Sequence, residues 1–222
     1  MVVWEVLNTA SNSGIFLQQF NADGTIIGYN RVRLDASDNS TGFDIAPQIA
    51  AVGSTGQYAV TWIGEDSGGD FSIYVQQFNA SGTTVGFSPV KLEPTGITDR
   101  LDIYSQITAL GSDGDYAVAW YGQDSASLSN VYVQRFNASG TTQGALIKID
   151  SPLATMTFEE NTQIVSVGSE GAFVVVWQGV APNSSTNLIG VQQFNSDGTR
   201  GSSTQLGLYA NCLLYTSDAA DE

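Results

Sequence analysis

The stretch QQFNADGT (18–25) is the first of four near-identical copies in a chain of 222 residues. The others read QQFNASGT (76–83), QRFNASGT (134–141) and QQFNSDGT (192–199), and successive copies begin 58 residues apart. The four tryptophans, at 4, 62, 120 and 177, follow nearly the same period. A period of this length indicates a repeat protein, so each motif has to be compared with its own copies before a function is given to it.

One unit, taken over residues 47–94, contains four segments typical of β-strands. They read PQIAAVG, QYAVTWIG, FSIYVQQF and TTVGFSPVKL, and they are rich in the residues that strands prefer. The segment QYAVTWIG is apolar or small on both faces, which predicts a strand buried on both sides. The short links GSTG and NASG predict tight turns, so we expect a meander of four antiparallel strands.

A single sheet with two apolar faces must be covered by copies of itself. We therefore expect an all-β fold in which units of about 58 residues form the blades of a partial, open β-propeller. The alternative is a linear array of β-sandwich-like units, although a seven-strand sandwich usually needs about 100 residues. The expected units are an incomplete first repeat containing strands two to four, followed by three full repeats; they span residues 1–34, 35–94, 95–150 and 151–211.

The last residues, NCLLYTSDAADE (211–222), match nothing in the repeats. Codons for this tail can be written so that they resemble a sequencing-library adapter, and we interpret residues 212–222 as translated adapter without ordered structure. This segment contains Cys212, the only cysteine, so the repeats themselves have no thiol chemistry. The start MVVWEVLNTA shows no signal peptide.

The stretch 18–25 itself has two interpretations. Alternating oxygen ligands followed by glycine look like half of a calcium loop. However, the position of Asp23 is Ser81 and Ser139 in the second and third copies, whereas every copy keeps an Asn first and a Gly fourth. Those are the preferences of a hairpin turn, so we expect a turn between strands three and four.

Composition excludes several function classes. The net charge is −15 and no segment is basic, which argues against nucleic acid and anionic membranes as partners. No apolar run is long enough to insert into a membrane as a helix. There is no histidine, which removes histidine-based triads and histidine metal sites. No glycine-rich phosphate loop and no nucleophile elbow occurs.

The repeats resemble a known group of proteins. The segments GAFVVVWQG (171–179) and VYVQRFNASGTTQG (131–144) are similar to repeats of very large secreted bacterial proteins of the RTX-type (hemolysin-type calcium-binding) or adhesin class. The resemblance implies an extracellular or cell-surface location and a role as a repeat module. The calcium-binding glycine- and aspartate-rich nonapeptides of such proteins are absent here.

Clustered carboxylates are the remaining candidates for a site. Glu65, Asp66 and Asp70 follow Trp62, and a solvated acidic loop is the simplest interpretation; weak calcium binding is the alternative, and no other metal or cofactor is expected. Asp113 and Asp115 belong to a predicted hairpin turn, and Glu170 lies in the equivalent turn of the next copy.

Two repeated residue types are interpreted as structural. Trp62, Trp120 and Trp177 lie on doubly apolar strands, so we expect them in the core rather than stacked on sugars. The repeated Gln76 and Gln134 need hydrogen-bond partners, and we predict that each amide ties its blade to a neighbouring backbone.

The sequence alone thus favours a non-catalytic extracellular module, a spacer or adhesion scaffold without catalytic residues. Its expected partners are neighbouring repeats of the same longer chain, with surface glycans or host and matrix proteins as further candidates. The alternatives are a carbohydrate-binding propeller and a propeller glycoside hydrolase or lyase. These need a concave pocket with convergent polar side chains from different blades, and a hydrolase needs paired carboxylates there.

Overall fold

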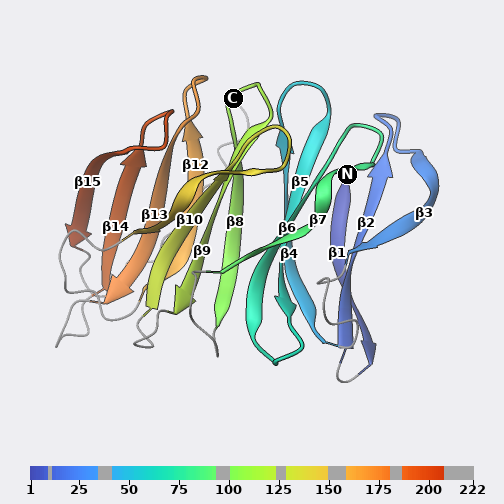
Figure 1. The fold of residues 1–222 in the computed structure, drawn as a ribbon, viewed down its shortest axis with the longest axis horizontal. Helices are drawn as coiled ribbons and strands as arrows, with labels where there is room; N and C mark the ends of the chain where they lie inside the picture. Colours follow the sequence, from blue (N-terminus) through green and yellow to red (C-terminus); the bar gives the residue numbers. More distant parts are fainter. Residues whose placement is uncertain are drawn as a thin grey trace.

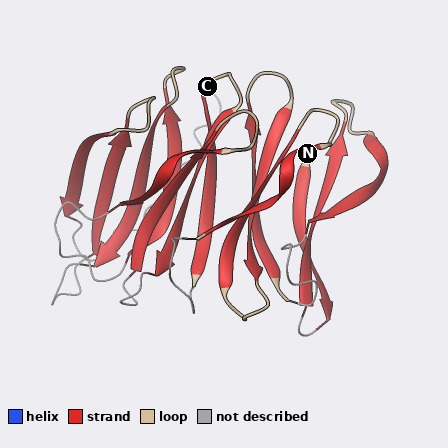
Figure 2. Ribbon diagram, viewed as in Figure 1, coloured by secondary structure: helices blue, strands red, loops and turns tan. Residues whose placement is uncertain are grey.

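The computed structural model describes residues 1–9, 12–34, 42–93, 101–123, 129–149, 159–180 and 187–207. Within these ranges all regular structure is β-strand, as Figure 2 shows. None of these residues forms a helix that could cross a membrane. The predicted adapter segment, 212–222, lies outside the described residues.

The strands form four antiparallel sheets, here called the first to fourth blades. The first blade holds β1 (Val2–Thr9), β2 (Asn12–Phe20) and β3 (Ile26–Leu34). The second holds β4 (Asp44–Val52), β5 (Gln57–Glu65), β6 (Phe71–Phe78) and β7 (Thr84–Leu92). The third holds β8 (Asp102–Leu110), β9 (Asp115–Gln123), β10 (Ser129–Phe136) and β11 (Thr142–Ile149). The fourth holds β12 (Glu159–Val167), β13 (Ala172–Val180), β14 (Asn187–Phe194) and β15 (Arg200–Gly207).

The blades stand side by side in chain order, from blue on the right to red on the left of Figure 1. The blades formed by the described residues do not close into a ring. β4, β8 and β12 are the inner strands, because they contact one another from blade to blade. The prediction of four-stranded antiparallel units arranged as an open propeller is therefore confirmed, and the first blade is a sheet of three strands.

Each internal contact between blades joins an aromatic face to an aliphatic face. Tyr58, Trp62 and Tyr74 of the second blade cover Ile15 and Leu17 of the first. The opposite face of the second blade is aliphatic and covers aromatic residues of the third, and the same pattern joins the third blade to the fourth. Side chains alternate along a strand, so one doubly apolar strand supplies both faces.

The repeated tryptophans lie in the core, as predicted. Trp62, Trp120 and Trp177 have no exposed surface. The indole Nε1–H of Trp62 donates to Asp44 at 3.0 Å, and that of Trp120 donates to Asp102 at 3.2 Å. Each Asp opens the inner strand of its blade, so the pair fixes the start of β4 or β8 against the second strand.

The inner strands share a backbone irregularity. Ala46, Tyr104 and Asn161 have φ of 51°, 56° and 53°, in a conformation that residues other than glycine rarely adopt. Each lies where the pairing between the first two strands of a blade shifts register. A β-bulge at this point bends every inner strand in the same way.

The opening motif is the predicted hairpin turn in all four blades. Gly24, Gly82, Gly140 and Gly198 have φ between 74° and 85°, and each donates its N–H to the carbonyl of the first Asn of its turn. In the first copy, hydrogen bonds from the Thr25 hydroxyl and N–H lower the pKa of Asp23. The oxygens that suggested half a calcium loop are thus acceptors for the turn itself.

Candidate functional site

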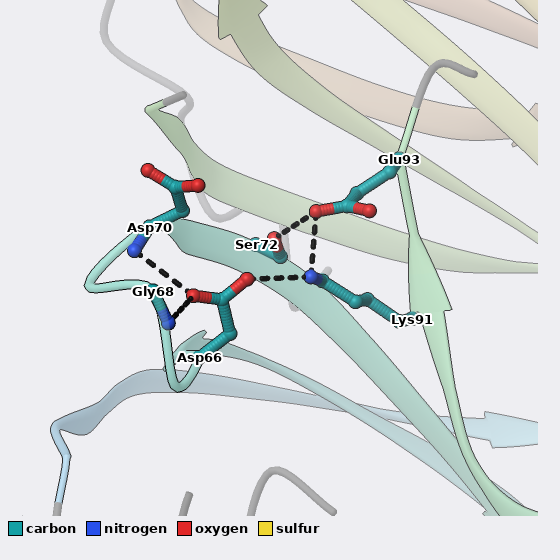
Figure 3. A network of polar contacts seen from close by, with 6 residues as sticks. All are labelled: Asp66, Gly68, Asp70, Ser72, Lys91 and Glu93. Atoms are coloured by element: carbon teal, nitrogen blue, oxygen red, sulfur yellow. Dashed lines mark hydrogen bonds and ion pairs between the residues drawn. The ribbon is translucent and has the colours of Figure 1, made fainter. Parts of the chain in front are cut away.

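The predicted calcium candidates lie around the link between β5 and β6 (Figure 3). Oδ1 of Asp66 accepts the backbone N–H groups of Gly68 and Asp70 at 2.8 and 3.1 Å. Its Oδ2 accepts the ammonium of Lys91 at 2.8 Å, and Lys91 also pairs with Glu93 at 2.7 Å. Asp66 therefore orders the loop and forms an ion pair with Lys91, which lies on the fourth strand of the same blade.

The other two candidates do not converge on Asp66. Oε2 of Glu65 accepts the backbone N–H of Phe43 at 3.0 Å, which ties the end of β5 to the start of the blade. Figure 3 shows the carboxylate of Asp70 directed away from Lys91. In the part of the chain that the structure describes, no group of three or more acidic, histidine or cysteine side chains is placed to hold a metal ion.

Calcium binding at this loop stays a prediction, and the position of Lys91 argues against it. A ligand that binds only the folded state raises the melting temperature. We expect that titrating calcium to about 5 mM leaves the melting temperature unchanged, because Lys91 already neutralises Asp66. Thermal unfolding monitored by circular dichroism measures this, and a clear rise with calcium but not with magnesium would restore the calcium hypothesis.

The pKa of Asp66 gives this loop a pH dependence. Burial alone disfavours its charge, but the hydrogen bonds from Lys91 and from two backbone N–H groups, with the charge on Lys91, together lower its pKa from the usual 3.8. A lowered pKa stabilises the fold above the usual value, and this contribution is lost as the pH falls below 3.8 through the pKa of the folded state.

Asp66→Asn is therefore expected to cost about 1–2 kcal/mol of stability at neutral pH. Urea unfolding of both proteins across pH 2.5–7 measures the difference. We expect it to shrink towards zero at the acid end, since both side chains are then neutral. A difference that is constant over the whole range would contradict this role of the ionised carboxylate.

The repeated glutamines make the predicted hydrogen bonds to backbone, but within their own blade. The amides of Gln76 and Gln134 donate to the carbonyl of the next residue, at 2.9 and 3.0 Å, and to carbonyls of the fourth strand. Each Gln lies in a break of register between the third and fourth strands. The side-chain amide donates hydrogen bonds to backbone carbonyl groups at the point where the regular pairing between the two strands is interrupted.

The hydrogen bonds between neighbouring blades come from the residue that follows each repeated glutamine in the sequence. These bonds were not predicted from the sequence. Gln19 donates to the carbonyl of Ala80 at 2.5 Å, and Gln77 donates to that of Ala138 at 3.1 Å. The third member of the series is Arg135, whose Nη2 donates to the carbonyl of Ser196 at 2.7 Å. In all three bonds the donor and the acceptor are 61 residues apart in the sequence. This separation has a meaning only when the packing of one blade on the next is known.

Arg135 distinguishes the contact between the third and fourth blades from the other two. It is 8% exposed, and its Nε has no hydrogen-bond partner among the described residues. A cavity of about 490 Å³ opens beside it. The cavity is lined by residues of the third blade and of the turn of the fourth, including Arg135, Gln143, Ala145, Ile147, Ser196 and Asp197.

A second, smaller cavity of about 140 Å³ shares Arg135 and Ser196 with the first. Asp113 and Asp115 line it from the third blade, and Glu170 lines it from the fourth. The two cavities together, here called the Arg135 cleft, have the size of a small-molecule site. The turns at 111–114 and 168–171 were predicted as hairpins only; the fold brings their carboxylates to one cleft.

Three carboxylates of the Arg135 cleft accept hydrogen bonds, those of Asp113, Asp115 and Asp197. The hydroxyl of Ser112 donates to Asp113 at 3.1 Å, and Asp115 accepts the backbone N–H of Ala138 at 3.0 Å. Hydrogen bonds from the Thr199 side chain and backbone lower the pKa of Asp197, and the charge of Arg135 adds to this. Asp113 and Glu170 are solvent-exposed, so a ligand can reach both.

Comparisons with known proteins bear on the fold. No family model and no curated protein matches the sequence, so the resemblance to RTX-type or adhesin repeats stays a prediction. Among solved structures, an endo-arabinase from Bacteroides thetaiotaomicron is 12% identical with a TM-score of 0.52, and the match covers 95% of this chain and 76% of that one. A thermostable family-43 glycoside hydrolase is 14% identical with a TM-score of 0.46, over 96% of this chain and 74% of that one.

These neighbours are five-bladed propellers, and at 12% identity the likeness to the endo-arabinase shows the fold. The finding corrects the expectation of a non-catalytic spacer or adhesion module. That expectation came from the lack of a catalytic motif in any single repeat. The blades are arranged like those of the endo-arabinase, and at this identity the likeness concerns the fold.

Proposed function

We propose that the chain is a carbohydrate-active propeller of the glycoside hydrolase type, which cleaves a polysaccharide in the Arg135 cleft. The observation that carries the proposal is the position of Asp113 and Glu170, which come from adjacent blades and line one cavity around a buried arginine. Glycosidic bond cleavage needs two carboxyl groups on either side of the bond. The propeller fold shared with an endo-arabinase supports the same chemistry.

The two carboxyl groups take different roles. One carboxyl group attacks the sugar or activates water, and the other gives its proton to the leaving oxygen, which breaks the glycosidic bond. We assign the first role to Asp113, whose carboxylate is positioned by the Ser112 hydroxyl at 3.1 Å, and the second to Glu170.

Arg135 orients the sugar. Its guanidinium is held in place by the carbonyl of Ser196, while Nε has no partner in the described part of the chain. Arg135 lines both cavities, so its guanidinium can donate a charge-assisted hydrogen bond to a sugar hydroxyl in the cleft. The aliphatic side of Ile147 and the amide of Gln143 line the larger cavity and complete a surface for a second sugar ring.

Hydrolysis of a polysaccharide panel tests this function directly. The protein is incubated with arabinan, xylan, pectin and cellulose, and new reducing ends are measured. We expect release from at least one of these polymers, with arabinan first because the structural neighbour is an endo-arabinase. Binding without any release of reducing ends would contradict hydrolysis and support a carbohydrate-binding propeller.

The proposal includes the environment in which the chain acts. A polysaccharide substrate is met outside the cell, so an extracellular or cell-surface location and glycan partners remain part of it. The large acidic excess is consistent with this, because a net charge of −15 repels nucleic acids and does not oppose a neutral glycan.

A further inference from the structure

The two end faces of the blade stack are complementary halves of the interface that repeats inside the chain. Three internal contacts join the aliphatic face of one blade to the aromatic face of the next. The first blade lacks an earlier neighbour for its aromatic face, and the fourth lacks a later neighbour for its aliphatic face within the described residues.

The aliphatic face of the fourth blade is exposed where its equivalents are buried. Val167 pairs with Ala172 as Leu110 pairs with Asp115, yet Val167 is 44% exposed and Leu110 is 4% exposed. Leu206 holds the place of Ile149 in the third blade and is 51% exposed, while Ile149 is completely buried. Val165 is 56% exposed on the same strand as Val167.

The aromatic face of the first blade shows the same contrast. Val2 pairs with Gln18 as Val60 pairs with Gln76, but Val2 is 49% exposed and Val60 is buried. Trp4 is half-buried, whereas the equivalent tryptophans are fully covered by the preceding blade. Phe16, beside Trp4, is 8% exposed, with the Arg31 guanidinium carbon 4.5 Å from its ring centroid, so the exposed apolar surface of this face centres on Val2 and Trp4. Exposed apolar patches can mark interaction surfaces.

We propose that a second copy of this chain covers these faces, head to tail, with the fourth blade of one copy packed on the first blade of the next. The contact continues an interface that the fold already forms three times, and each copy carries both halves of it. Because the two halves differ, the contact is heterologous and leaves one free face at each end of a pair.

The series of ties between blades predicts a specific hydrogen bond in this contact. Gln19, Gln77 and Arg135 each donate to a turn carbonyl of the following blade, 61 residues further on. The next member of the series is Gln193, which is exposed at the open face. In a head-to-tail pair its amide reaches the carbonyl of Ala22, which holds the same turn position in the first blade of the other copy.

Mass measurement in solution tests the proposal on the chain as it is. Light scattering of the wild type is expected to give a mass that rises above 23.5 kDa with concentration. Val165→Lys blocks one face and Val2→Lys blocks the other, and each alone is expected to reduce association at least tenfold. Tyr104→Lys is the matched control, because Tyr104 is equally exposed but lies on an inner strand of the third blade. Gln193→Ala is expected to weaken association about two- to tenfold.

Mixing the two blocked variants distinguishes head-to-tail contact from other modes. Each variant keeps the face that the other has lost, so we expect a one-to-one pair of about twice the monomer mass, with no larger species. A wild type that stays monomeric up to about 100 µM would overturn the proposal, and so would a mixture that stays monomeric while each variant melts like the wild type. Neither outcome bears on glycan cleavage, which does not depend on this contact.

Discussion

Replacing Trp120 with alanine is expected to lower the free energy of unfolding by about 3–5 kcal/mol, the usual cost of removing a buried large aromatic side chain. Trp120 has no exposed surface, stacks on Tyr132 with ring centroids 5.7 Å apart, and donates to Asp102. The substitution leaves a cavity between the second and third blades and takes a donor from a buried carboxylate. In a chain of this size the melting temperature should fall by roughly 10 °C.

The repeat supplies a matched control for this experiment. Trp4 holds the same position in the first blade, but it is only half-buried because no blade covers it among the described residues. Trp4→Ala is therefore expected to cost about 1 kcal/mol. Urea unfolding of both variants compares them in one assay, and equal losses would contradict the conclusion that stacking of blades, rather than the strand itself, holds the tryptophan.

The second large effect is expected on catalysis. Asp113→Asn and Glu170→Gln should each reduce polysaccharide hydrolysis by about 10²–10⁴-fold, the range associated with a general acid or base. Both substitutions keep the shape of the side chain and lie in exposed turns, so the fold should be unaffected. The measurement is the initial rate of reducing-end release, with binding of the same polymer measured in parallel.

The control for catalysis is a carboxylate outside the Arg135 cleft. Asp23 lies in the turn of the first blade, far along the stack from the third and fourth. Asp23→Asn is expected to keep the wild-type rate. If both cleft variants retained full activity while hydrolysis by the wild type was present, the active site would have to lie elsewhere in the chain.

Much of the fold could be predicted because the same sequence motifs recur in each repeat. The 58-residue period, the doubly apolar second strand and the turn at Asn21 each recur, and four copies separate structural residues from incidental ones. The turn appears as expected, with Gly24 and its equivalents at positive φ. A residue that packs in the same way in every blade recurs in the sequence with the period of the repeat.

The candidate site could not be predicted in this way, because it depends on differences between copies. Arg135 replaces a glutamine in one repeat only, and Asp113 and Glu170 come from turns that looked like ordinary hairpins. Nothing in the sequence places two turns against each other before the angle between blades is known. The aspartates at 44 and 102 were missed for a related reason, since their partners are tryptophans 18 residues away.

The central claim is that a glycan is bound and cleaved between the third and fourth blades. The most direct measurement is a crystal structure of the Glu170→Gln variant soaked with an oligosaccharide of the polymer that the wild type hydrolyses. We predict density for sugar rings in the Arg135 cleft, with a hydroxyl bonded to the guanidinium of Arg135 and the scissile oxygen beside residue 170. Sugar bound only along the inner strands, or on another blade, would contradict the claim.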